Sequence, residues 1–224
     1  MNNLIIIGIV IVAIIAIAYF CLRENFVSYK SEYDNREYNV LQKYPNHQEA
    51  AELMAKINSA IIRLHKHLRE KYQIYFPEMT PAELASRLQI SEESLIARQR
   101  AISNVLNRYN PEVLYETNPQ NLLGETSSTI DKGKKMYFCL RYRDNPIKLV
   151  PYHVILYVTL HEISHVAADV WGHPPEFWSI FKFILIEAQE SGVYEPINYA
   201  EYPEKYCGIV IAENTLLDDS ITSI

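Results

Sequence analysis

Apolar residues recur at helical spacing over a long segment in the first half of the chain. Between Asn46 and Tyr72 they repeat at intervals of three and four, at Ala50, Leu53, Met54, Ile57, Ala60, Ile61, Leu64 and Leu68. This spacing predicts an amphipathic helix with Asn46 as its N-cap.

Two shorter helices are expected after this long one. They should span residues 80–89 and 91–109, and Thr80 followed by Pro81 is a typical start for the first of them. Residues 111–129 lack a regular apolar pattern and contain helix breakers, so they are expected to form a loop.

The second half of the chain combines one alternating segment with two apolar ones. Residues 135–143 alternate between apolar and polar positions and predict a strand. Residues 151–168 and 176–191 predict helices, separated by a Gly- and Pro-containing break at 172–175, and 208–212 is a short strand candidate. The pattern therefore predicts an α+β domain that is mostly helical and has a small sheet.

The N-terminal segment is apolar throughout. Residues 4–22 contain no charged side chain, and nineteen helical residues would span about 28 Å, close to the thickness of a bilayer core. The alternative is a cleaved signal peptide, because Ala16 to Ala18 resemble a cleavage site. The long apolar run and the absence of a basic residue before it favour a transmembrane helix, which would make the lipid bilayer a partner.

The positions of basic residues predict how such an anchor would be oriented. Arg23 and Lys30 follow the apolar run and no basic residue precedes it, which places the rest of the chain on the cytoplasmic or virion-interior side. We therefore expect a single-pass membrane protein with an anchor at 1–22, a juxtamembrane linker at 23–45 and one domain at 46–224.

The composition fits this organisation and limits the partners. The chain has 224 residues, of which 49% are hydrophobic and 21% are charged, enough apolar residues for one substantial core. The net charge of -6 argues against a protein that binds nucleic acid over its whole surface. A basic cluster from Arg63 to Lys71 keeps nucleic acid as an alternative partner, but it lacks interleaved aromatic residues and reads more simply as a solvated helix end.

Three cysteines are too few for a disulfide framework. Cys21, Cys139 and Cys207 are widely separated and none belongs to a CxxC pair, so they supply no sulfur-based zinc site. A bridge between Cys139 and Cys207 remains an alternative, although small buried residues are the preferred interpretation.

A metal-binding pattern lies in the predicted helix at 151–168. His161 and His165 frame the sequence HEISH, and residues four apart share one face of a helix, so both imidazoles can reach the same ion. Zinc is the expected cofactor, and Glu162 is placed to act as the general base on the zinc-bound water.

The third zinc ligand is expected beyond a reversal of the chain. In a continuous helix, His173 would lie about 18 Å from His161, too far to share an ion, but Gly172 and the two prolines after His173 favour a turn back. Glu187 on the following helix is the alternative third ligand. Asp169 is expected to orient one of the histidines.

These motifs together resemble the WLM family of zinc peptidases, which is related to the SprT-like peptidases. The matching elements lie within 126–192 and comprise Asp131-Lys132-Gly133, the strand ending Cys139-Leu140-Arg141, HEISH, and the downstream GHPPEFW. The resemblance implies a zincin-like fold, His161, His165 and His173 as ligands, and Glu162 as base. It also implies that 135–143 is an edge strand that pairs with an extended substrate. Membrane-anchored versions in large DNA viruses imply a viral origin.

The sequence therefore predicts a membrane-anchored zinc metallopeptidase that hydrolyses peptide bonds in a protein or peptide substrate. Two alternatives come from other classes of protein. One is a non-catalytic membrane scaffold with a structural zinc site, and the other is a nucleic-acid-associated protein that uses the cluster from Arg63 to Lys71. An intact glutamate in the motif disfavours the scaffold, because a structural site needs no base.

Overall fold

The computed structural model describes residues 11–12, 25–121, 124 and 126–224, and these form an α+β fold. The α-helices are α2 (His47–Lys71), α3 (Pro81–Leu88), α4 (Glu92–Arg108), α5 (Tyr152–Ala167) and α6 (Pro175–Glu190), with a 3-10 turn η1 (Asp131–Gly133). The main sheet contains β1 (Phe26–Lys30), β2 (Glu37–Leu41), β3 (Leu114–Glu116), β4 (Ser128–Ile130) and β5 (Lys135–Phe138). A separate hairpin contains β6 (Glu204–Tyr206) and β7 (Ile209–Ile211).

The helices follow the predicted apolar pattern closely. Thr80 begins α3 with a capping box, in which its hydroxyl accepts from the Glu83 amide and the Glu83 carboxylate accepts from the Thr80 amide. Asn46 does precede α2, but its side chain makes no cap. Asn46 thus occupies the predicted N-cap position, while its side chain bonds to Arg141 and to the Ile147 carbonyl.

The sheet is larger than the sequence pattern predicts, and its edge lies elsewhere. The strand order is β1-β2-β3-β5-β4, so β5 is paired on both sides and the expectation that 135–143 forms an edge strand is wrong. The edge beside the histidines is β4, which runs antiparallel to β5. Strands β3 and β4 arise from the segment expected as a loop, because three residues are too few to show an alternating pattern.

The segment expected as a linker also joins the sheet. Strands β1 and β2 pair antiparallel between residues 26 and 41, and Tyr38 and Val40 belong to the same continuous core as the helices. This core includes residues from Tyr38 to Ile211.

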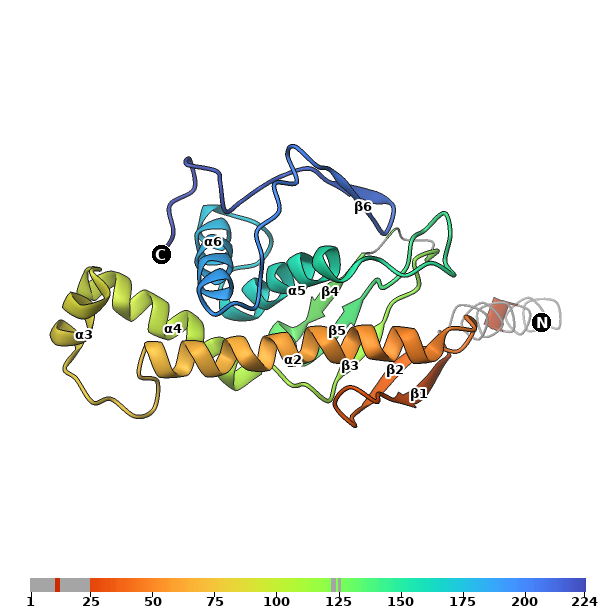
Figure 1. The fold of residues 1–224 in the computed structure, drawn as a ribbon, viewed down its shortest axis with the longest axis horizontal. Coiled ribbons are helices and arrows are strands. Elements are labelled where there is room, and N and C mark those ends of the chain that lie inside the picture. The colour runs from red at the N-terminus through yellow and green to blue at the C-terminus, as the bar shows by residue number, and fades with distance from the viewer. Residues whose placement is uncertain (1–10, 13–24, 122–123, 125) are drawn as a thin grey trace, which may run out of the picture.

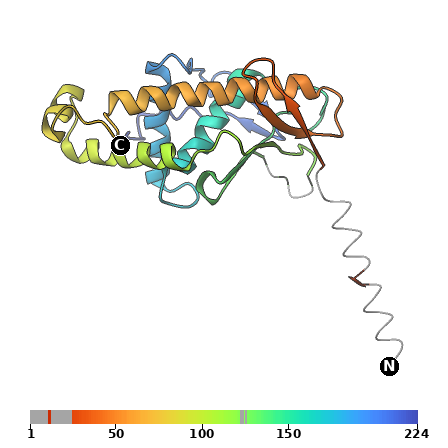
Figure 2. The same cartoon turned by 90° about the horizontal axis from the view of Figure 1, so that it is seen from below.

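Helix α5 occupies the middle of the fold. Figure 1 places α2 along one side of α5 and the β6–β7 hairpin on the other. The turned view in Figure 2 shows that α4 runs beside α2. Eleven of the sixteen residues of α5 are buried. Its strongly apolar sequence is explained by this burial, because the helix contacts other elements on almost every face.

The prediction of a single-pass membrane protein requires correction. The expected span at 4–22 lies outside the described residues except for Ile11 and Val12. None of the helices in the described part of the chain combines the length and the apolar content needed to cross a bilayer. The transmembrane fold class and the cytoplasmic or virion-interior location based on it are therefore wrong.

A disulfide connects the end of β5 to the C-terminal hairpin. Cys139 and Cys207 are bonded, which corrects the preferred interpretation of two separate buried residues. The Tyr206 hydroxyl also bonds to the buried Ser127 side chain, next to β4. The hairpin is thus held against the sheet by one covalent and one polar contact.

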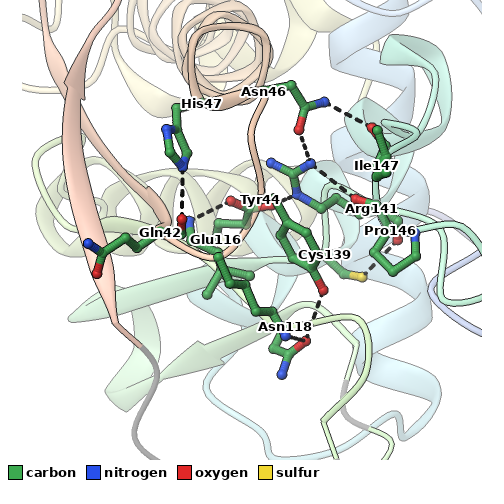
Figure 3. A network of polar contacts seen from close by, with 12 residues as sticks. Gln42, Tyr44, Asn46, His47, Glu116, Asn118, Cys139, Arg141, Pro146 and Ile147 are labelled. Carbon is green, nitrogen blue, oxygen red and sulfur yellow. Dashed lines mark hydrogen bonds and ion pairs between the residues drawn. The ribbon is translucent and has the colours of Figure 1, made fainter.

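A buried ion pair joins the sheet to the start of α2 (Figure 3). The guanidinium of Arg141 and the carboxylate of Glu116 are both fully buried and in direct contact. Glu116 also accepts from the Leu41 amide at 2.7 Å, while Arg141 donates to Asn46 and to the Pro146 carbonyl. Strands β2 and β3 share a single pair of aligned residues, and the bond from Leu41 to Glu116 adds a side-chain contact between them.

Replacing the buried arginine tests that connection. Arg141→Met should lower the free energy of unfolding by about 3–5 kcal/mol, because it leaves the buried Glu116 carboxylate without its charged partner. The control is Arg36→Met, which removes an exposed pair with Glu112 and should cost less than about 1 kcal/mol. Chemical denaturation of both variants measures the difference, and equal losses would contradict the structural role of the buried pair.

Candidate metal centre

Three histidines converge at one end of helix α5. His161 and His165 lie four residues apart on this helix, and His173 reaches them from the following loop. The Nε2 atom of His173 is 3.0 Å from Nε2 of His161 and 3.1 Å from Nε2 of His165. Two zinc ligands in a tetrahedral site lie roughly 3.3 Å apart, so these nitrogens have nearly the spacing that zinc requires.

The predicted chain reversal brings His173 to this position. Helix α5 ends at Ala167, Gly172 adopts a left-handed conformation with φ of 70°, and α6 begins at Pro175. Pro174 is extended, as expected for a residue that precedes a proline. The loop between the helices therefore turns back, and His173 lies beside α5 instead of beyond its end.

Phe177 on α6 supports all three histidine rings. Its side chain is fully buried, stacks on His165 with ring centroids 4.2 Å apart, and meets the rings of His161 and His173 edge-on at 4.9 and 4.8 Å. This contact fixes the orientation of the imidazoles through packing.

The environment of His161 and His165 keeps both imidazoles in their neutral, metal-binding form. Burial, assisted by the neighbouring histidines, lowers the pKa of His161 to about 3. Burial likewise lowers the pKa of His165 to about 4, with His173 and Lys132 contributing. Neutral imidazole nitrogens are suitable zinc ligands, so the donor set fits zinc in chemistry as well as in spacing.

Glu162 is buried beside the histidine cluster. One carboxylate oxygen accepts a hydrogen bond of 2.8 Å from the Thr129 hydroxyl on edge strand β4. Burial raises the pKa of Glu162 to about 7, and the bond from Thr129 opposes only part of that rise. The carboxyl group can therefore take up and release a proton near neutral pH.

The cluster opens into a surface cleft of about 300 Å³. Ser128 and Thr129 of β4 form one wall, and the loop containing Trp171 and His173 forms another. Lys132 also borders the cleft, bonds to the Val170 carbonyl and lies 4.9 Å from the Trp171 ring. The cleft thus lies between edge strand β4 and the loop that carries His173.

The structure places the competing candidate residues elsewhere. Glu187 is buried against Lys71, His67 and Tyr72, so it is not available to the three histidines and the alternative third ligand is wrong. Glu190 also contacts Lys71, whose ammonium group already serves as the cation among these carboxylates.

Asp169 does not orient a histidine, which corrects that expectation as well. Its carboxylate pairs with Arg100 at 2.8 Å and with Arg108 at 2.9 Å. These contacts connect the end of α5 to α4 and have no direct part in the histidine cluster.

Two site residues escaped the analysis of the sequence. Thr129 lies on a three-residue strand within an expected loop, and Tyr206 lies just before the strand expected at 208–212. Neither position carries a local signal, because contact with Glu162 or Ser127 depends on segments more than thirty residues away.

Comparison with known proteins provides viral relatives. No family model matches the chain. The uncharacterized protein R325 of Acanthamoeba polyphaga mimivirus is 33% identical over 220 residues, which cover 96% of this chain and 100% of that protein. The uncharacterized protein 136R of Invertebrate iridescent virus 6 is 34% identical over 85 residues, or 38% of this chain and 46% of that protein.

Among solved structures, Wss1 from Saccharomyces cerevisiae aligns with a TM-score of 0.41 and 16% identity, covering 67% of this chain and 85% of the Wss1 chain. A Wss1 mutant aligns with a TM-score of 0.40 and the same identity, over 69% and 92% of the two chains. The near full-length match to the mimivirus protein defines the relationship. The chain belongs to the family of protein R325 of Acanthamoeba polyphaga mimivirus.

Proposed function

We propose that this protein is a zinc-dependent peptidase whose site is formed by three histidines and Glu162. The observation that carries the proposal is the convergence of the three Nε2 atoms beside a buried carboxyl group with a pKa of about 7. The sequence resemblance of residues 126–192 to WLM peptidases points to the same activity.

His161, His165 and His173 would hold the zinc ion. When bound, zinc would supply Lewis-acid polarisation of water and of the scissile carbonyl group. A structural zinc site normally has four protein ligands, whereas a catalytic site has three and leaves one position open. The group formed here by the described residues contains three histidine ligands. This count disfavours the scaffold alternative.

Glu162 would move the proton during hydrolysis. Thr129 donates to one carboxylate oxygen and thereby orients the group, which leaves the second oxygen to accept a proton from water. The proton would then pass to the amine of the departing peptide segment. The raised pKa of Glu162 suits both proton transfers near neutral pH.

The substrate would bind as an extended strand. Strand β4 has β5 on one side, and its other edge borders the cleft that contains the histidines. Backbone hydrogen bonds to this edge would align a peptide without regard to most of its side chains. The proposal thus takes β4 as the substrate-binding edge, whereas the sequence resemblance implied 135–143.

The nucleic-acid alternative gains no specific support from the basic cluster. Within this cluster, Lys71 pairs with Glu187 and Glu190, and His67 pairs with Glu187. These contacts use part of its positive charge inside the protein, which weakens the case for a phosphate-binding surface.

Replacing the proposed base should separate catalysis from metal binding. Glu162→Gln should lower kcat/KM by at least about 10²-fold, because the amide cannot accept a proton, while zinc content stays at one ion per chain. Cleavage of a peptide mixture, followed by mass spectrometry, and elemental analysis measure the two effects. Undiminished cleavage would contradict the assignment of Glu162.

Removing the loop histidine should weaken zinc binding. His173→Ala should lower zinc affinity by at least about 100-fold, because replacing a residue that only orients a metal ligand already lowers metal affinity by about 10- to 100-fold. His153→Ala is the matched control: this histidine lies on α5, near Glu204 instead of the cluster. Competition with a chromophoric chelator measures both affinities, and equal values would exclude His173 as a ligand.

The buried carboxyl group should also make the metal-free protein sensitive to pH. The folded pKa of Glu162, about 7, lies above its ordinary value of 4.5. Its contribution to stability is therefore complete below about pH 4.5 and is lost as pH rises through 7. In chelator-treated protein, the stability of Glu162→Gln relative to wild type should rise by roughly 2–3 kcal/mol between pH 5 and pH 8.

Denaturant unfolding at the two pH values provides the test. The control is Glu70→Gln, which alters an exposed glutamate on α2. The difference in the free energy of unfolding between this variant and wild type should be the same at both pH values. A pH-independent effect of Glu162→Gln would show that the carboxyl group is not held neutral by burial.

A further inference from the structure

A second hollow, of about 320 Å³, lies on the other side of the motif. It shares Thr126, His161 and Glu162 with the cleft described above, so the two hollows meet at the residues that would perform the reaction. A peptide chain passing the histidines would therefore place a side chain close to each hollow.

The second hollow differs from the first in chemistry. Its lining is mainly apolar and aromatic and includes Val158 from α5, Trp178 and Phe181 from α6, and Ile211 from β7. Val158 lies one turn before Glu162 and therefore on the same face of α5. The first cleft instead exposes Ser128, Thr129 and Lys132.

The wall of this hollow is firmly held. Tyr206 and Ile211 belong to the C-terminal hairpin, which the Cys139–Cys207 disulfide attaches to the end of β5. Phe181 is fully buried and lies 5.2 Å from the His161 ring and 5.4 Å from the Tyr157 ring, measured between centroids. The hollow is thus formed by packed elements.

We propose that this hollow is the specificity subsite for a bulky apolar side chain of the substrate, next to the scissile bond. The proposal rests on the proposed peptidase function and assigns it a substrate class, namely peptides with a leucine-sized or aromatic residue at one position. The exposed Glu213 at the rim disfavours an acidic side chain there. Burying a leucine instead of an alanine removes about three additional methylene equivalents from water, which predicts roughly 10- to 50-fold tighter binding.

Binding can be measured without turnover. Trp178 lines the subsite, so its fluorescence can report occupancy in a Glu162→Gln protein that also carries Trp171→Phe to remove the other tryptophan. The probes are two capped hexapeptides of alanine and serine that differ by a single central leucine. The leucine peptide should bind at least about tenfold more tightly.

Filling the subsite should abolish this preference. Val158→Phe, added to the same protein, should bring the two affinities within about threefold, because the larger ring occupies the space for leucine. Ile62→Phe is the matched control: Ile62 is exposed on α2, and its replacement should preserve the preference. Val210→Asp provides a second variant, at an exposed position of the same wall, and should weaken binding of the leucine peptide. Thermal unfolding establishes that each variant is folded.

The outcomes separate this inference from the proposed function. Equal binding of both peptides to the parent protein, or a preference that survives both Val158→Phe and Val210→Asp, would overturn the subsite. Selective binding of leucine combined with no cleavage by zinc-loaded wild type would support the subsite and overturn the peptidase function. Cleavage beside apolar residues that shifts to small residues in Val158→Phe would support both.

Discussion

Helix α5 is buried on most of its surface, and the other elements of the domain are arranged around it. Helices α2, α4 and α6, the turn η1 and strands β4 and β5 all pack against it. The buried hydroxyl groups of Thr159 and Ser164 are satisfied within the helix, because they donate to the carbonyls of Ile155 and Leu160. The two motif histidines and Glu162 instead line the cleft, and His161 and Glu162 also line the adjoining hollow.

Burial has opposite consequences for these groups, and both suit zinc chemistry. It lowers the pKa of His161 and His165, which keeps their nitrogens neutral, and it raises the pKa of Glu162 into the range useful for proton transfer. The same desolvation thus prepares the ligands and the base. Ionising the buried Glu162 carboxylate lowers the free energy of unfolding, a cost that is common at functional sites.

The walls of the site are connected over long distances in the sequence. Edge strand β4 contacts Glu162 through Thr129, and the C-terminal hairpin is attached to β5 through Cys207. The buried pair of Glu116 and Arg141 fixes β3 to the segment that follows β5 and to the start of α2. The geometry of the site therefore rests on contacts between segments that form no local motif.

The helices and the histidine cluster could be predicted from the sequence, because helical periodicity, the i to i+4 spacing and the Gly-Pro reversal are local properties. The sequence did not determine the short strands, the sheet edge or the disulfide, and it wrongly favoured Asp169 as a histidine partner. These features depend on which distant segments meet: Thr129 reaches Glu162, and Asp169 reaches arginines of α4, only after α5 is packed. Side chains so far apart leave no periodic trace, so tertiary packing alone decided their partners.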